Sequence, residues 1–197
     1  MINSSNPALV QDCRFQSNRA EQFGGAIYIC AGAQANIRGT EFSNNFAEEG
    51  GALATSFDVK LNLQNNKFVK NIATSLGGAI SFTGDSKNIV DTEYVQRDSV
   101  FHENWAGQSG GASYWHASTM TTDQPCFGCT YNLNMAGHYG SNEASDVTSV
   151  IVPVSSQYVF YPGIGSTNSS FYLNLVDYFG QTVHSSSGTG VLHMFRK

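Results

Sequence analysis

The 197-residue chain is poor in charged side chains, which make up only 13% of it. Ten lysines and arginines stand against fifteen acidic residues, so the net charge is −5. Binding to the phosphate backbone of nucleic acid needs a basic surface, and this composition argues against that function. There is also no run of 18 or more apolar residues, so the sequence predicts no segment that spans a membrane.

The N-terminus lacks the features of a secretory signal peptide. Residues 1–13 contain no basic segment followed by an apolar one. The repeats described below start within about eight residues, which leaves no room for the terminal cap that a solenoid normally carries. We therefore expect the chain to be an excerpt from a longer protein, and Met1 need not be its natural start.

Motifs of the common enzyme classes are missing as well. The sequence has no nucleophile elbow, phosphate-binding loop or dinucleotide fingerprint. Glu21 and the pair Glu48-Glu49 fall at the same polar turn of successive repeats, where stacked glutamates are usually solvated. The histidines at 102, 116, 138, 184 and 193 show no metal-ligand spacing. We expect no catalysis, no cofactor and no metal.

What the sequence does contain is one phrase repeated four times. It reads Phe-x-x-Asn-x-Ala, then a short polar turn, then Gly-Gly-Ala. The copies cover residues 15–27, 42–53, 68–80 and 101–113. Their phenylalanines are 27, 26 and 33 residues apart, and self-similarity at such a period indicates a repeat architecture. Gly-Gly pairs disfavour helices, and short β-favouring runs precede each phenylalanine, so each unit predicts one coil of a parallel β-solenoid.

Aligned copies give columns of identical residues. We expect the phenylalanines to stack inside the solenoid and the asparagines to hydrogen-bond from coil to coil at a bend. The two columns are Phe15, Phe42, Phe68 and Phe101, and Asn18, Asn45, Asn71 and Asn104. After each Gly-Gly the residues alternate with period 2, as in a strand. Ile27 and Ile29 would face inward, and the intervening column (Tyr28, Ala54, Ser81 and Tyr114) would be wetter.

These paired motifs resemble the repeat of the chlamydial polymorphic outer-membrane proteins. They are also similar to repeats in large right-handed β-helix surface proteins of protists and algae. The resemblance covers about residues 8–116. It implies an extracellular, non-enzymatic surface or adhesive protein, and together with the rule for parallel crossovers it implies a right-handed solenoid.

The predicted domain organisation has three parts. Residues 1–116 form the parallel β-helix, with an insertion within 84–98 that would form either a recognition loop or a tolerated surface loop. Residues 117–145 form a closing coil or linker that holds the Cys-x-x-Cys. Residues 146–197 are strand-like and turn-rich, and 171–183 resembles the immunoglobulin-like modules that follow such β-helices. We expect a small, incomplete β-sandwich there.

The four cysteines predict disulfides. Cys126 and Cys129 have a redox-like or half-zinc spacing, but no helical pattern follows and no second ligand pair exists. A structural disulfide is favoured over free thiols or a metal. Cys13 and Cys30 lie on two strands of the first coil, which a second disulfide would staple.

Two Asn-x-Ser sequons, at Asn3 and Asn168, predict glycan attachment; Asn168 is the better candidate because it lies in a turn between strands.

The function that we expect is that of a segment of a large extracellular structural or adhesive protein, such as a flagellar hair or a surface coat. Its partners would be other chains or copies of itself, with a glycan possible. Two alternatives stay open. A β-helix enzyme acting on polysaccharide would need clustered carboxylates on one face. A carbohydrate-binding adhesin would need a row of outward aromatic rings, for which Tyr28, Trp105 and Tyr114 are the candidates.

Overall fold

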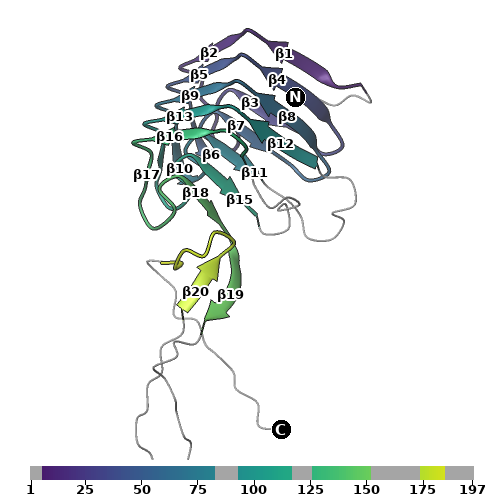
Figure 1. Ribbon diagram of the computed structural model, residues 1–197. Coiled ribbons are helices and arrows are strands. Elements are labelled where there is room, and N and C mark those ends of the chain that lie inside the picture. The colour runs from purple at the N-terminus through teal and green to yellow at the C-terminus, as the bar shows by residue number, and fades with distance from the viewer. Residues whose placement is uncertain (1–5, 83–92, 117–125, 152–173, 185–197) are drawn as a thin grey trace, which may run out of the picture.

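The computed structural model describes residues 6–82, 93–116, 126–151 and 174–184. Within these ranges the chain is all β and contains no helix. Its strands stack coil upon coil into a parallel β-solenoid, which confirms that part of the predicted fold (Figure 1). Of the expected immunoglobulin-like sandwich, the described residues form only a two-stranded antiparallel sheet beyond the last coil.

The coils run in turn through four narrow sheets, which we label B, C, D and A; the first coil joins sheet D, and the fifth coil joins sheet B, only through isolated bridges. Sheet B contains β1 (Ala8–Gln11), β4 (Gln34–Arg38), β8 (Lys60–Gln64) and β12 (Glu93–Arg97). Sheet C contains β2 (Arg14–Gln16), β5 (Glu41–Ser43), β9 (Lys67–Val69), β13 (Val100–His102) and β16 (Thr130–Asn132). Sheet D contains β6 (Phe46–Glu49), β10 (Ile72–Leu76), β14 (Trp105–Ala106) and β17 (Met135–Ala136). Sheet A contains β3 (Ile27–Ile29), β7 (Leu53–Thr55), β11 (Ile80–Phe82), β15 (Ser113–Trp115) and β18 (Glu143–Ser145).

The Gly-Gly pair forms the corner between sheets D and A. The first glycine of each pair has a positive φ, between 56° and 72° over the four repeats. The second glycine stacks on its own counterpart: a Cβ on Gly78 would lie 2.1 Å from the carbonyl oxygen of Gly111. In the fifth coil this second position is Ser141, beyond which the described residues add no further coil. The pair is therefore required by the stacking itself.

The corner between sheets C and D is built from non-glycine residues with left-handed backbone. Each has φ between 53° and 56°, a conformation that costs an L-residue about 1–2 kcal/mol. The five residues are Ser17, Asn44, Lys70, Glu103 and Leu133. The strain is offset by the asparagine that follows each of them, whose side chain bonds to the neighbouring coils.

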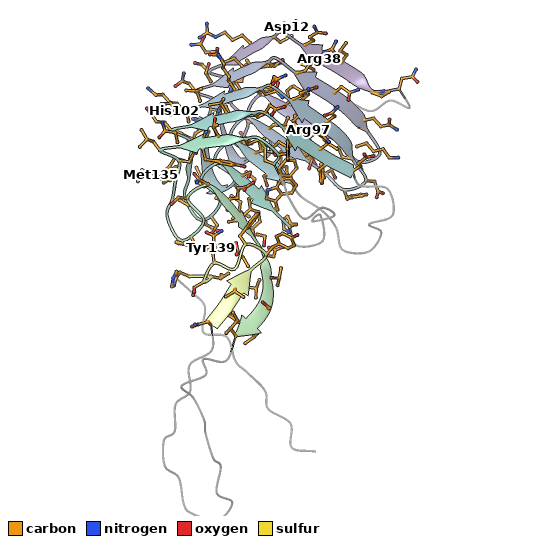
Figure 2. The ribbon with its side chains drawn as sticks, viewed as in Figure 1. Asp12, Arg38, Arg97, His102, Met135 and Tyr139 are labelled. Carbon is orange, nitrogen blue, oxygen red and sulfur yellow. A yellow bond between two sulfur atoms is a disulfide. The ribbon has the colours of Figure 1, made fainter. Side chains whose placement is uncertain are left out.

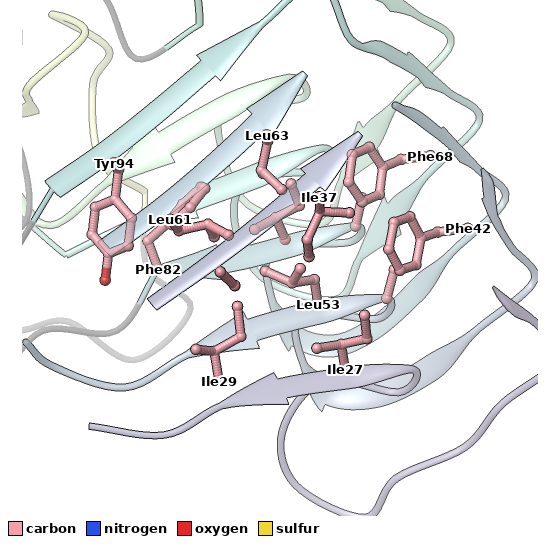
Figure 3. Close-up of a cluster of buried hydrophobic side chains, with 14 of the residues drawn as sticks. Ile27, Ile29, Ile37, Phe42, Leu53, Leu61, Leu63, Phe68, Phe82 and Tyr94 are labelled. Atoms are coloured by element: carbon pink, nitrogen blue, oxygen red, sulfur yellow. The ribbon is translucent and has the colours of Figure 1, made fainter. Parts of the chain in front are cut away.

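The core fills the space between the sheets (Figure 3). Phe42, Phe68 and Phe101 are fully buried, and each such side chain contributes roughly 1.5–3 kcal/mol. Near the later coils the core gains larger rings, because Phe82 stacks on Trp115 with 3.8 Å between their ring centroids.

The outer face of sheet A is drier than the sequence predicted. Ala54, Ser81 and Tyr114 were expected on a wetter face, but their exposed fractions are 0%, 0% and 5%. The segment before each Gly-Gly folds back over this face; for example, Ser81 lies 3.4 Å from the carboxylate of Glu49. Period-2 alternation identifies the two faces of a strand, but it cannot tell that both are covered.

Residues 130–145 form a fifth coil in register with the fourth. Tyr131 pairs with Phe101, Ala136 with Ala106 and Ala144 with Tyr114. The segment is a degenerate repeat, in which tyrosine replaces phenylalanine and Gly140-Ser141 replaces Gly-Gly.

A short cap follows this coil: β19 (Val147–Ile151) pairs with β20 (Asn174–Asp177), and the turn after β20 packs on the end of the solenoid. Gln181 donates from Nε2 to the carbonyl oxygen of Glu143, and the backbone N–H of Ser145 donates to the Asp177 carboxylate. Both backbone groups lie on β18, the last strand of sheet A, and Phe179 covers the adjacent core. The Asp-x-x-Gly-Gln pattern thus closes one sheet edge of the solenoid.

Candidate protein-contact surface

The repeated phenylalanines form a continuous internal stack. Their ring centroids are 5.1, 4.9 and 4.9 Å apart along the column, and Tyr131 extends it at 5.2 Å. Interplanar angles of 5–7° between the phenylalanines show parallel rings, as the identical register of successive strands requires.

The repeated asparagines form a hydrogen-bonded ladder beside this stack. The side-chain Nδ2 of Asn71 donates to Oδ1 of Asn104 and to the carbonyl oxygen of Phe42, each at 3.0 Å. Its Oδ1 accepts from both the backbone N–H and the Nδ2 of Asn45. Asn134 continues the ladder into the fifth coil, where it also donates to Asn142. Every polar atom of the Asn71 side chain is satisfied although the residue is fully buried.

A second polar ladder, which sequence analysis missed, lines the corner between sheets B and C. The backbone N–H groups of Thr40 and Asn66 donate to the side-chain oxygens of Asn66 and Ser99, respectively. Cys13 donates its backbone N–H to Thr40 in the same column. Its members differ in residue type from coil to coil, so alignment of identical residues could not find it.

The repeated residues are therefore interior, and contacts with other molecules fall to the variable outward positions. One outward column is consistently apolar. It lies on the outer face of sheet D, between the Asn and Ala columns, and contains Phe46, Ile72, Trp105 and Met135. Ile72, Trp105 and Met135 are 40%, 41% and 63% exposed, and we call the four residues the apolar stripe. Met135 lies at the surface of the solenoid in Figure 2.

Polar groups lie at one end and along one edge of the apolar stripe. Arg19 covers its first member, with the guanidinium carbon 4.2 Å from the centre of the Phe46 ring. The indole of Trp105 lies against Gly107, where a Cβ would be 3.4 Å from the ring. Along one edge, Lys70 and Glu103 form an exposed ion pair at 3.3 Å. An apolar patch with such a polar rim is typical of a protein-contact surface.

The expected disulfide between Cys126 and Cys129 is present, and both residues pack against the end of the core. Cys13 and Cys30 are free thiols instead of the expected staple. Cys13 lies at the corner between sheets B and C, and Cys30 at the corner between sheets A and B. The length of a sheet B strand separates these corners, about 16 Å for five residues, which is far beyond disulfide reach.

A polar cluster joins β15 to the start of the cap. Asp146 accepts a hydrogen bond from the hydroxyl of Tyr114 at 2.6 Å, and its other oxygen lies 2.9 Å from Nδ1 of His116. The hydrogen bond with Asp146 raises the pKa of His116, against the opposing effect of burial. This cluster ties the cap to the solenoid.

The last coil also places a half-buried carboxyl group at an inward position. Glu143 occupies the inward column that holds Ile80 and Ser113 in the two preceding coils. Burial raises the pKa of Glu143, although the nearby hydroxyl groups of Tyr131 and Ser113 oppose the shift.

The remaining predicted sites do not gather. Glu48 is exposed, Glu49 is half-buried with its pKa raised by burial, and Glu21 is exposed. No group of three or more His, Cys, Asp or Glu side chains suited to a metal occurs in the described part of the chain. Asn3, Asn168 and His193, and residues 84–92 of the insertion, lie outside the described residues.

The aromatic candidates for sugar binding also separate. Tyr114 is buried, Tyr28 stacks on Phe23, and only Trp105 presents an exposed ring. A shallow depression of about 240 Å³ on the outer face of sheet B has polar lining residues such as Gln34, Asn36 and Asn62, and none of the residues lining it is aromatic.

Comparison with known proteins identifies the repeat. Residues 12–30 match the Chlamydia polymorphic membrane protein (Chlamydia_PMP) repeat. This confirms the predicted polymorphic membrane protein-type repeat, and it points to a surface or outer-membrane protein of the β-helix type. No curated protein and no solved structure gives a significant match. Across the residues that the structure describes, no helix is long and apolar enough to cross a membrane.

Proposed function

We propose that this chain is a non-enzymatic segment of a large extracellular structural or adhesive protein, acting through contacts with other protein chains. The proposal rests on one observation: the inward and outward positions of the repeat have different roles. The Phe, Asn and Gly-Gly positions make contacts between successive coils, whereas an exposed apolar stripe runs across four coils on the outer face of sheet D. The match to a surface-protein repeat supports an extracellular location. A flagellar hair or surface coat is a concrete assembly of this kind.

Localisation and assembly test this proposal together. Intact cells that make the protein would be labelled with a membrane-impermeant amine reagent and then cross-linked, and the modified peptides would be identified by mass spectrometry. We expect labelled surface lysines and cross-links to other protein chains. Labelling only after cell lysis would overturn the extracellular location. Depolymerisation of a polysaccharide by the purified chain would instead favour the enzyme alternative, and tight glycan binding without cleavage would favour the adhesin alternative.

The proposal also includes the handedness of the solenoid, the module formed by residues 146–197 and two glycosylation sites. The solenoid is right-handed, in line with the general rule for parallel crossovers. Residues 146–197 belong to an immunoglobulin-like module, of which β19 and β20 are one sheet. Asn168 and Asn3 carry glycans, which peptide mapping of the native protein before and after glycosidase treatment would reveal as a loss of mass.

A further inference from the structure

The geometry of sheet D points to self-association: two copies of this chain pair face to face through the apolar stripe, with their solenoid axes antiparallel. The inference deepens the proposed function and rests on it, because it names the partner of one outer face as a second copy. It concerns the stripe residues Phe46, Ile72, Trp105 and Met135 and the flanking ion pair of Lys70 and Glu103.

The apolar stripe is suited to a flat, regular partner. Its members sit on directly paired strands, so their backbones repeat at about 4.8 Å along the solenoid. Three of them are at least 40% exposed. A second stripe with the same spacing matches this surface residue by residue, as an isologous interface requires.

Charge complementarity selects the antiparallel orientation. Lys70 stands two residues before Ile72, and Glu103 two residues before Trp105, so both charges flank the same edge of the stripe on neighbouring coils. A two-fold axis along the strand direction, between the third and fourth coils, places Ile72 opposite Trp105 of the second copy. The same axis places Lys70 opposite Glu103 of the second copy, and Glu103 opposite Lys70 of the second copy. The Lys70–Glu103 ion pair within each copy then joins a four-charge arrangement, with two further opposite-charge contacts across the interface.

The parallel orientation lacks this match. A two-fold axis along the solenoid would keep each residue at its own coil and exchange the two edges of the stripe. Lys70 would then face Thr74 of the second copy, and Glu103 would face Gly107, so neither charge would gain an intermolecular partner in addition to its pairing within the chain. The antiparallel pair also brings the exposed Met135 of one copy to the end of the stripe where Arg19 lies over Phe46 of the other. Because the patch is small, we expect a dissociation constant in the micromolar range or weaker.

Sedimentation equilibrium over a wide concentration range tests the surface. We expect the wild-type chain to dimerise, and Trp105→Asp or Ile72→Asp to raise the dissociation constant at least about tenfold. Leu9→Asp is the matched control, because Leu9 is 60% exposed on sheet B, away from the stripe, and should leave dimerisation unchanged. Circular dichroism checks that each variant keeps its β structure. A wild-type chain that stays monomeric to about 1 mM, or stripe variants that dimerise as wild type does, would overturn the inference.

A charge-swap mixture tests the orientation. Lys70→Glu alone sets glutamate against glutamate in an antiparallel dimer, and Glu103→Lys alone sets lysine against lysine, so each should dimerise about tenfold more weakly. Mixed together, the two variants should form heterodimers at close to wild-type strength, measured by sedimentation with one variant fluorescently labelled. Equal affinities for all combinations would rule out the antiparallel pair. These results are independent of the cell-surface labelling, so the failure of the dimer and the failure of the proposed function are distinguishable.

Discussion

Gly78 stacks directly on Gly111 of the next coil, so close that a Cβ on Gly78 would lie 2.1 Å from the Gly111 carbonyl oxygen. The same contact repeats along the column, which explains why this position is glycine in all four repeats. Ser141, in the fifth coil, has no such neighbour within the described residues and carries a side chain. The column therefore shows directly which residues lie inside the stack.

We predict that Gly78→Ala lowers the free energy of unfolding by about 3 kcal/mol or more, because the added methyl forces neighbouring coils apart. Urea unfolding followed by circular dichroism measures the loss. Ser141→Ala is the matched control and should be within about 0.5 kcal/mol of wild type. Similar stabilities for the two variants would contradict the stacking argument.

The asparagine ladder predicts a position-dependent loss. Asn71→Ala removes four hydrogen bonds and leaves buried partners on two adjacent coils unpaired, so we expect a loss of at least about 3 kcal/mol. Asn18→Ala, at the exposed start of the ladder, removes one side-chain bond and should cost about 1 kcal/mol. Denaturant titration of both variants measures the two losses in the free energy of unfolding. Equal losses would contradict the position-dependent role of the ladder.

Leu133 combines a left-handed backbone with a side chain that is 66% exposed, so it has strain without compensating burial. Leu133→Asn should raise the free energy of unfolding by about 0.5–1 kcal/mol, because asparagine tolerates this conformation better. Leu9→Asn, at an exposed strand position, should give no such gain. Thermal unfolding of the two variants tests this, and a destabilised Leu133→Asn would refute it.

The half-buried carboxyl of Glu143 predicts a gain in stability when its charge is removed. Its pKa is raised in the folded state, so ionisation at neutral pH opposes folding, and the penalty disappears as the pH falls toward 4.5. Glu143→Gln should therefore raise the free energy of unfolding by on the order of 1 kcal/mol at pH 7, with little effect at pH 4. Urea unfolding at both pH values measures the difference. A variant less stable than wild type at pH 7 would show that the carboxylate is needed where it lies.

His116 predicts a second pH effect, with its own window. The folded-state pKa is raised by Asp146, so the interaction stabilises the fold fully below about pH 6.5 and is lost as the pH rises through the raised value. We expect His116→Gln to be less stable than wild type at pH 6 and to approach it at pH 9. Hydrogen exchange of the Asp146 amide, measured over the same pH range, tests whether the loss of stability occurs at the junction with the cap. A stability difference that does not vary with pH would contradict the ion pair.

The sequence alone was enough to predict the solenoid, because stacking one coil on the next demands the same type of residue at the same place. Phe68, Asn71 and Gly78 each satisfy a demand that recurs at every coil, and so they appear as identical columns. The aligned columns did not include the fifth coil, where the sequence predicted a closing coil or linker, because Tyr131 and Ser141 replace phenylalanine and glycine there. The ladder through Thr40, Asn66 and Ser99 was not predicted for the same reason: any side chain that places a hydrogen-bond acceptor at this corner can form it.

Only the tertiary structure decided where the surface lies. The apolar stripe combines four unlike residues, and their shared outward direction follows from the register of sheet D, which no single repeat contains. The free thiols of Cys13 and Cys30 follow from the distance between two corners, and the buried face of Ala54 and Ser81 from a segment that folds back over it. Repetition in the sequence reflects contacts between equivalent positions of successive coils. Contacts between different columns, like the exposed surface, arise only when each coil closes on itself.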